Sequence, residues 1–199
     1  DNLVRLWDPK TGEELPMSPL ASHSKRIRSV HFNLDSSKLL STSDDGTSVI
    51  WKFSPDMQLL PPTNEPVTPR GVEPFKILNS FDDRSIERIN SGQFGPQGLL
   101  VATVDNEKFL RIWDSDSGNM LAEFRHPDIP LALDFYRNDQ VVTVCDDSTV
   151  RFFSIQYPAG IAEGFPVLDL EMIGSQRGHQ GRVRSVAVDP TDNYVLTGG

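Results

Sequence analysis

The sequence predicts an all-β protein, a β-propeller of four-stranded antiparallel blades. Three observations favour this fold. A phrase ending in an aromatic residue recurs about every forty residues, short strands of alternating polarity are separated by turn residues, and no long segment has the apolar stripe of a helix. A repeat of this length, with several short strands in each unit, is typical of propellers and solenoids.

The recurring phrase pairs an acidic residue with an aromatic residue six positions later. The pairs are Asp1 and Trp7, Asp45 and Trp51, Glu107 and Trp113, and Asp147 and Phe153. The four aromatic residues are 44, 62 and 40 positions apart. One such phrase would be weak evidence, but four in register with the strands and turns indicate a repeated structural unit.

The strands follow the repeat in order. In the first complete unit the segment RIRSVHF (26–32) alternates in polarity, NLDSS is a turn because Asn, Asp and Ser bond their own backbone, and strands at 38–43 and 47–53 flank the tight turn DDG. The same pattern predicts strands at 88–94, 99–104, 108–113, 131–135, 140–144, 148–153, 182–188 and 193–198, with outer strands at 75–78, 120–124 and 167–173.

These strands divide the 199 residues into five pieces of one partial propeller. The pieces are 1–21 (the end of a blade), 22–79 (complete, with a long loop at 54–73), 80–124 (complete), 125–173 (complete, with a loop at 154–166) and 174–199 (the start of a blade). The long loop is rich in proline, which blocks sheet pairing. Because the chain begins and stops inside a repeat, we expect it to be an internal piece of a longer protein.

The composition excludes several classes of function. The formal net charge of −9 argues against a general nucleic-acid binder or an anionic-membrane binder, because contacts to phosphate need clustered Lys and Arg. The single cysteine, Cys145, cannot form an internal disulfide, which favours a reducing compartment; we expect a cytoplasmic protein, with the nucleus also open. No motif for a metal or another cofactor is present, so we expect none.

The motifs resemble those of the WD-repeat β-propeller family over the whole chain. The residues that carry the resemblance are the Gly178-His179 opener, the Trp7-Asp8 and Trp113-Asp114 closers, and the acidic-to-aromatic phrases between them. The resemblance implies that this is part of a propeller usually built of seven blades. It also implies a buried hydrogen-bond chain in each blade, made by a His, a Ser or Thr, an Asp and the Trp.

In the first complete blade that chain would join His23, Ser41 or Ser43, Asp45 and Trp51. The resemblance assigns the same structural role to Glu107, Trp113, His126, Asp147, Phe153 and His179. We expect incomplete or water-filled networks in two blades, because Ser85 stands where a His would and Phe153 has no N–H to donate. A metal or catalytic role for the histidines and acids is the alternative; a real site would interrupt the repeat, whereas these residues form it.

Arginines occupy one repeated position that the scaffold does not explain. Arg26, Arg88 and Arg182 stand just before the first inner strand of three blades, and Asp128 takes that place in another. The resemblance places this position on the face near the central channel. We expect a basic face that binds an acidic or phosphorylated peptide. The alternative is that each Arg pairs with a nearby acid such as Asp44 or Asp146. The loops at 54–73 and 154–166 should leave the opposite face.

The function that the resemblance implies is a non-enzymatic scaffold that presents its faces and loops to protein or peptide partners. One alternative is the docking or sensory propeller of a larger enzyme, such as a bacterial serine/threonine kinase, with catalysis outside these residues. A weaker alternative is a propeller enzyme with its site in the central funnel.

Overall fold

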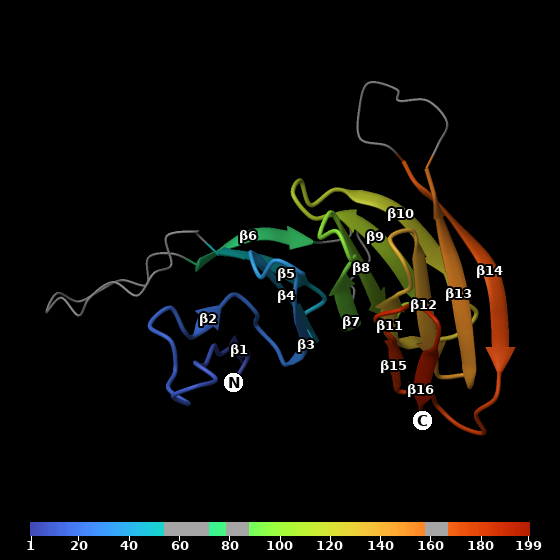
Figure 1. Cartoon of the computed structure of the whole chain (residues 1–199), viewed down its shortest axis with the longest axis horizontal. Helices are drawn as coiled ribbons and strands as arrows, with labels where there is room; N and C mark the ends of the chain where they lie inside the picture. Colours follow the sequence, from blue (N-terminus) through green and yellow to red (C-terminus); the bar gives the residue numbers. More distant parts are fainter. Residues whose placement is uncertain (54–71, 79–87, 158–166) are drawn as a thin grey trace, which may run out of the picture.

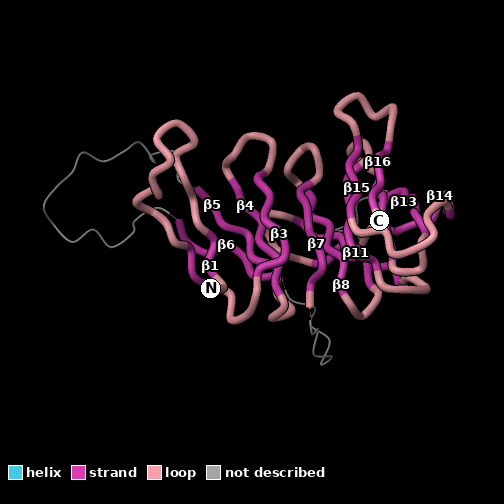
Figure 2. Tube along the Cα trace, turned by 90° about the horizontal axis from the view of Figure 1, so that it is seen from below, coloured by secondary structure: helices cyan, strands magenta, loops and turns pink. Residues whose placement is uncertain are grey.

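The computed structural model describes residues 1–53, 72–78, 88–157 and 167–199, and it contains antiparallel sheets that follow one another along an arc (Figures 1 and 2). Three sheets have four strands and two have two strands. The described residues contain no helix. The all-β propeller fold predicted from the sequence is therefore confirmed.

The strands run through the sheets in chain order. The first sheet pairs β1 (Leu3–Val4) with β2 (Leu20–Ala21), and the last pairs β15 (Ser185–Val188) with β16 (Val195–Gly198). The complete blades are β3 (Ile27–Phe32), β4 (Lys38–Ser43), β5 (Ser48–Phe53) and β6 (Val72–Leu78); then β7 (Ile89–Phe94), β8 (Leu100–Asp105), β9 (Phe109–Asp114) and β10 (Met120–Arg125); then β11 (Pro130–Phe135), β12 (Gln140–Cys145), β13 (Thr149–Gln156) and β14 (Asp169–Arg177).

The inner strands β3, β7, β11 and β15 lie next to one another, and hydrogen bonds join the blades there (Figure 2). The Gly92 N–H donates to Ser29 Oγ at 3.2 Å, and the Val188 N–H donates to Asp134 Oδ2 at 2.8 Å. Only glycine fits at position 92, because a Cβ there would lie 2.7 Å from the Thr42 methyl carbon. Gly92 therefore allows the close approach of the first and second complete blades.

The apolar core lies between the blades. One cluster combines Leu40, Ile50 and Leu78 of the first complete blade with Val101 and Trp113 of the next. A larger cluster joins the second and third complete blades in the same way. A strand such as β4 is buried at every position, because both faces of its sheet are covered. Each sheet thus depends on its neighbours for burial, as expected for a repeat architecture.

Some strand limits differ from those expected. Val72 and Glu73 belong to β6 and not to the long loop, since β6 pairs with β5 as far as Phe53. The segment 154–156 extends β13, because its pairing with β14 continues to Asp169. The expected strand at 182–188 begins only at Ser185, and the outer strand expected at 167–173 runs on to Arg177. The remainder of both expected loops, at 54–71 and 158–166, lies outside the described residues.

Trp7 does not occupy the buried position of the other tryptophans. Its side chain is 54% exposed, and its backbone makes only an isolated bridge to Glu14. Trp51 and Trp113 are buried between sheets, at 1% and 3% exposure. The difference arises because Trp7 follows a strand of two residues and lies outside the sheet.

Candidate protein-interaction face

The buried hydrogen-bond chain is complete in the first full blade. The Trp51 indole N–H donates to Ser41 Oγ at 3.0 Å, and Ser41 Oγ lies 2.7 Å from His23 Nε2. His23 Nδ1 lies 3.0 Å from Asp45 Oδ2. Since an ionised carboxylate only accepts, Nδ1 carries the proton, and Ser41 donates to Nε2. The sequence left Ser41 and Ser43 open, and the structure selects Ser41.

Asp45 also holds the tight turn that follows β4. Partial burial opposes its ionisation, but hydrogen bonds from the Thr47 hydroxyl and from the Ser24 and Thr47 N–H groups outweigh this and hold the pKa of Asp45 below its ordinary value. The Asp45 carboxylate therefore accepts these hydrogen bonds from residues of its own blade.

The next blade replaces this chain with a buried ion pair. Trp113 Nε1–H still donates to Thr103 Oγ1 at 2.8 Å. Glu107, which the sequence placed in the position of Asp45, is exposed, so its expected structural role is not observed. The buried carboxylate is instead Asp105, which contacts the Arg111 guanidinium. Ser85, the residue expected in the position of the His, lies outside the described residues.

Burial and charge neutralisation have opposite effects on the ionisation of Asp105. Burial raises the pKa of Asp105 above its ordinary value, although the Phe109 N–H and the guanidinium favour the ionised form. Arg111 also lies over the Phe109 ring, 4.5 Å from its centroid. Glu107 is exposed because Asp105, two residues earlier, is the buried carboxylate of this blade.

The third full blade has an interrupted chain. His126 is buried at 2% exposure, its Nδ1 lies 3.8 Å from Cys145 Sγ, and its Nε2 has no hydrogen-bond partner. Thr143 Oγ1, the counterpart of Ser41, also lacks a partner. Phe153 packs against the imidazole edge-on with ring centroids 5.1 Å apart. The expectation of an incomplete network is thus met here.

Asp147 in this blade binds a neighbour other than His126. Burial opposes its ionisation, but the Arg151 guanidinium, 2.5 Å away, and Thr149 lower the pKa of Asp147 to about 2. Burial lowers the pKa of His126 to about 4, with help from the Arg151 charge. Burial also raises the pKa of the free Cys145 thiol. Cys145 is buried as expected, and its chemistry is that of a core residue.

The last described sheet repeats the hydroxyl-to-histidine link of the chain, since His179 Nε2 lies 2.8 Å from Thr197 Oγ1. Among the residues that the structure describes, no group of three or more His, Cys, Asp and Glu side chains is placed to hold a metal ion. The repeated residues His23, Asp45, Asp147 and His179 form hydrogen bonds within their own blades.

We use "arginine face" for the end of the blades that contains Arg26, Arg88 and Arg182. The Arg26 carbonyl accepts from the Asp44 N–H, and the Arg88 carbonyl accepts from the Asn106 N–H, so both lie beside the turn after the second strand. In the third full blade the same bond is made by Ile129, whose carbonyl accepts from the Asp146 N–H. Asp128 therefore lies one residue before the equivalent position, which Ile129 occupies, since β11 begins at Pro130 in the same register as β3 at Ile27 and β7 at Ile89.

The ion pairs that the described residues of this face form do not include Arg26. Arg28, and not Arg26, is the ion-pair partner of Asp44, which it binds with two hydrogen bonds of 2.6 and 3.0 Å. Arg26 is exposed and forms no ion pair within the described ranges. Pairing with nearby acids, the alternative to a binding role, thus fails for this residue.

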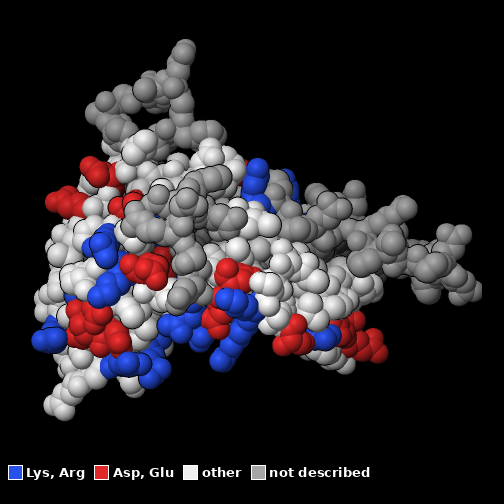
Figure 3. All heavy atoms as spheres, turned by 180° about the vertical axis from the view of Figure 1, so that it is seen from behind, with Lys and Arg blue, Asp and Glu red and all other residues white. Residues whose placement is uncertain are grey.

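The other predicted residues of the arginine face differ in their ion pairs and hydrogen bonds. Arg182 lies 2.6 Å from Asp146, in an ion pair whose geometry is not that of a hydrogen bond. Arg88 is half-buried, and its Nε has no hydrogen-bond partner. Asp128 forms an ion pair with Lys108 at 3.4 Å. Figure 3 shows Lys and Arg gathered along the lower edge of the molecule, with Asp and Glu between them.

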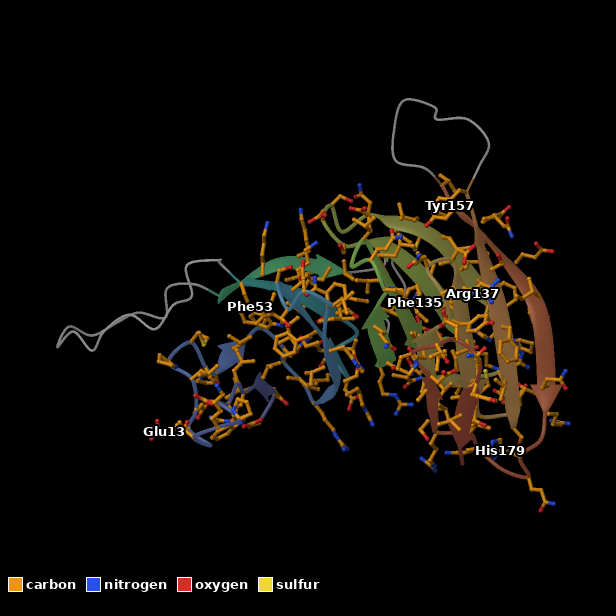
Figure 4. All side chains as sticks on the ribbon, in the orientation of Figure 1. Glu13, Phe53, Phe135, Arg137, Tyr157 and His179 are labelled. Carbon is orange, nitrogen blue, oxygen red and sulfur yellow. The ribbon has the colours of Figure 1, made fainter. Side chains whose placement is uncertain are left out.

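Two further arginines belong to the arginine face and were missed in the sequence. Arg28 and Arg184 each follow a predicted arginine by two residues, in RIRSV and RVRSV, and this Arg-x-Arg pattern was the available signal. Arg182 and Arg184 line a pocket of about 380 Å³ together with His179. His179 marks this end of the blades in Figure 4, whereas Tyr157 lies at the other end.

Comparisons with known proteins agree with the repeat. The model of the family "WD domain, G-beta repeat" matches residues 15–52 and 170–199. A nuclear distribution protein PAC1 of Zygosaccharomyces rouxii is 28% identical over 178 residues, covering 81% of this chain and 36% of the relative. A guanine nucleotide-binding protein subunit beta-like protein of Encephalitozoon cuniculi is 27% identical over 125 residues, covering 62% and 35%.

The fold has a solved counterpart as well. A chain in the crystal structure of the mitotic checkpoint complex superimposes with a TM-score of 0.70 at 14% identity, covering 94% of this chain and 50% of that one. The pre-mRNA-processing factor 19 homolog 2 of Arabidopsis thaliana is 26% identical over 184 residues, covering 78% and 35%. The chain thus spans about a third of the length of the curated relatives that it matches.

Proposed function

Since the chain belongs to the WD-repeat β-propeller family, whose members are protein-interaction scaffolds, we propose that it binds partner proteins through the arginine face and that the bound element is an acidic or phosphorylated segment. The observation that supports this most strongly is Arg26. It is exposed and lies at a repeated position, and the neighbouring Asp44 forms its ion pair with Arg28 instead.

The chemistry of the arginine face suits an anion. A guanidinium presents a planar set of donors that matches a carboxylate or a phosphate, and the exposed guanidinium of Arg26 presents such a set to solvent. Arg182 and Arg184 extend the basic surface along the pocket beside His179. On a protein with a formal net charge of −9, such a local basic face selects acidic partners by charge.

Fluorescence anisotropy with labelled peptides tests the proposal. A panel of acidic and phosphoserine peptides is titrated onto the full-length protein, and the tightest binder is then measured on Arg26→Glu. Reversing a charge that makes a charge-assisted hydrogen bond, worth about 1.5–3 kcal/mol, should weaken binding roughly tenfold to a hundredfold. Binding should also weaken as salt is raised.

The matched control is Arg137→Glu, the same charge reversal at an exposed residue in the turn between β11 and β12, at the opposite end of the blades. It should leave the affinity unchanged. Equal losses in both variants would point to a non-specific effect of net charge, and no loss in Arg26→Glu would exclude the arginine face as the binding surface.

We also place this scaffold inside the cell, in the cytoplasm or the nucleus. The free thiol of Cys145 suits a reducing compartment, and no helix within the described residues is long and apolar enough to cross a membrane. Microscopy of the fluorescently tagged full-length protein tests this placement; a secreted product would contradict it.

A further inference from the structure

A second pocket lies at the opposite end of the blades from the arginine face. It has a volume of about 210 Å³ and opens between the second and third full blades. Leu100, Leu121 and Leu168 form its apolar wall, and exposed Leu99 and Tyr157 stand at its rim. The residues around it come from the β7–β8, β9–β10 and β11–β12 turns with the strand ends next to them, and from Tyr157 and Leu168 beside the ends of β13 and β14; antiparallel pairing places all of these away from the arginines.

The pocket is preformed. The Leu168 N–H donates to the Leu121 carbonyl at 2.8 Å, so a backbone hydrogen bond joins the two blades along the apolar wall. Leu121 and Leu168 are buried at 6% and 3% exposure within one core cluster shared by both blades. A wall held in this way loses little conformational entropy when a side chain enters it.

Carboxylates stand beside the apolar wall. Asp114 lines the pocket, and its hydrogen bonds from Asp116 and Ser117 all reach Oδ1. Asp139 is exposed, follows the pocket residue Asn138, and forms no ion pair within the described part of the chain. The Ile155 N–H donates to the Asp139 carbonyl at 2.7 Å, which places Asp139 beside the end of β13, and burial and the Asp139 charge together raise the pKa of Tyr157.

We propose that this pocket binds an extended segment of a partner protein that inserts one large apolar side chain, such as Leu or Phe, and places a Lys or Arg next to it. The apolar side chain contacts Leu100, Leu121 and Leu168, and the cation faces Asp139. The segment bound here is basic, whereas the segment proposed for the arginine face is acidic. The two ends of the blades therefore select different partners. The pocket does not depend on the function proposed for the arginines.

Selection from a random-peptide phage library on the full-length protein tests the proposal without assuming a sequence. The selected peptides should share an apolar residue beside Lys or Arg. The best of them should bind about tenfold or more weakly to Asp139→Lys and to Tyr157→Ala, and should lose binding when its apolar residue becomes Ala. Selected peptides without this pattern, or with affinity unaffected by both variants, would overturn the proposal.

Three controls separate the alternatives. Glu171→Lys makes the same charge change on the exposed outer strand β14 and should not alter binding. Arg26→Glu should not alter it either, so a failure of the arginine face remains distinguishable from a failure of this pocket. If peptides bind only after residues 158–166 are replaced by a Gly-Ser linker, the natural occupant is the protein's own segment and the proposal is wrong.

Discussion

Acidification should destabilise the protein through His126. The side chain is 2% exposed, its Nε2 has no hydrogen-bond partner, and burial lowers its pKa from 6.5 to about 4. Above the unfolded-state pKa both the folded and the unfolded state hold a neutral imidazole, so His126 contributes no pH dependence there. Between the two pKa values only the unfolded state binds the proton, and the free energy of unfolding therefore falls as the pH falls.

The size of the effect follows from the shift. Each pKa unit corresponds to about 1.4 kcal/mol, so the full loss is about 3 kcal/mol once the pH is below the folded-state pKa. At about pH 5 the loss should be about 2 kcal/mol relative to about pH 7.5. Asp147, whose pKa is about 2, stays ionised throughout this window and does not add to the change.

Urea unfolding of the wild type and His126→Phe at these two pH values measures the contribution. The variant keeps an aromatic ring between Phe124 and Phe153 and removes the proton-binding group. The wild type should lose about 2 kcal/mol more than the variant on acidification. Equal losses would show that His126 is solvated or hydrogen-bonded in the folded state, and the account of an interrupted chain would fail.

Three stability predictions concern the other blades. Trp51→Ala should cost about 3–5 kcal/mol, since Trp51 is buried at 1% exposure; a native-like melting temperature would contradict its place in the core. Asp105→Asn should cost about 3 kcal/mol, because it leaves the buried Arg111 charge with only the half-exposed carboxylate of Glu123, 3.4 Å from its Nε; a neutral effect in urea unfolding would mean that Glu123 or water replaces Asp105. Lys38→Met should cost about 1–2 kcal/mol by removing two contacts to the next blade, the hydrogen bond from Lys38 Nζ to Ser115 Oγ at 2.9 Å and the ion pair with Asp116 at 2.7 Å; unchanged calorimetric stability would show that these contacts do not hold the blades together.

The repeat could be predicted from the sequence because local signals agree. Alternating polarity, Asx turns and the spacing of the aromatic residues all specify the same strands, and β4 begins and ends where the pattern places it. The strand limits next to the two loops were less certain, since pairing with an outer strand such as β14 depends on residues far along the chain. Trp7 shows that a repeated phrase does not guarantee burial when the sheet around it is short.

The polar contacts were harder to predict. The exchange of Glu107 for Asp105 as the buried acid depends on two residues: Arg111 stands where the first full blade has Val49, and Asp105 stands where it has Ser43. In the third full blade Cys145 takes the place of Asp105, and the equivalent Arg151 binds Asp147. The choice of Arg28 over Arg26 as the partner of Asp44 depends on side-chain reach across the turn. The apolar pocket joins residues from two blades, which no local pattern in the sequence indicates.

The central claim is that the arginine face binds an acidic or phosphorylated segment, and amide hydrogen exchange with and without the tightest acidic peptide tests it most directly. The account predicts slower exchange in the connections at 24–28 and 44–47 and in the corresponding turns of the neighbouring blades. It predicts no change at 95–99 and 136–139, at the other end of the same blades. Protection at that other end, with none at the arginines, would contradict the account.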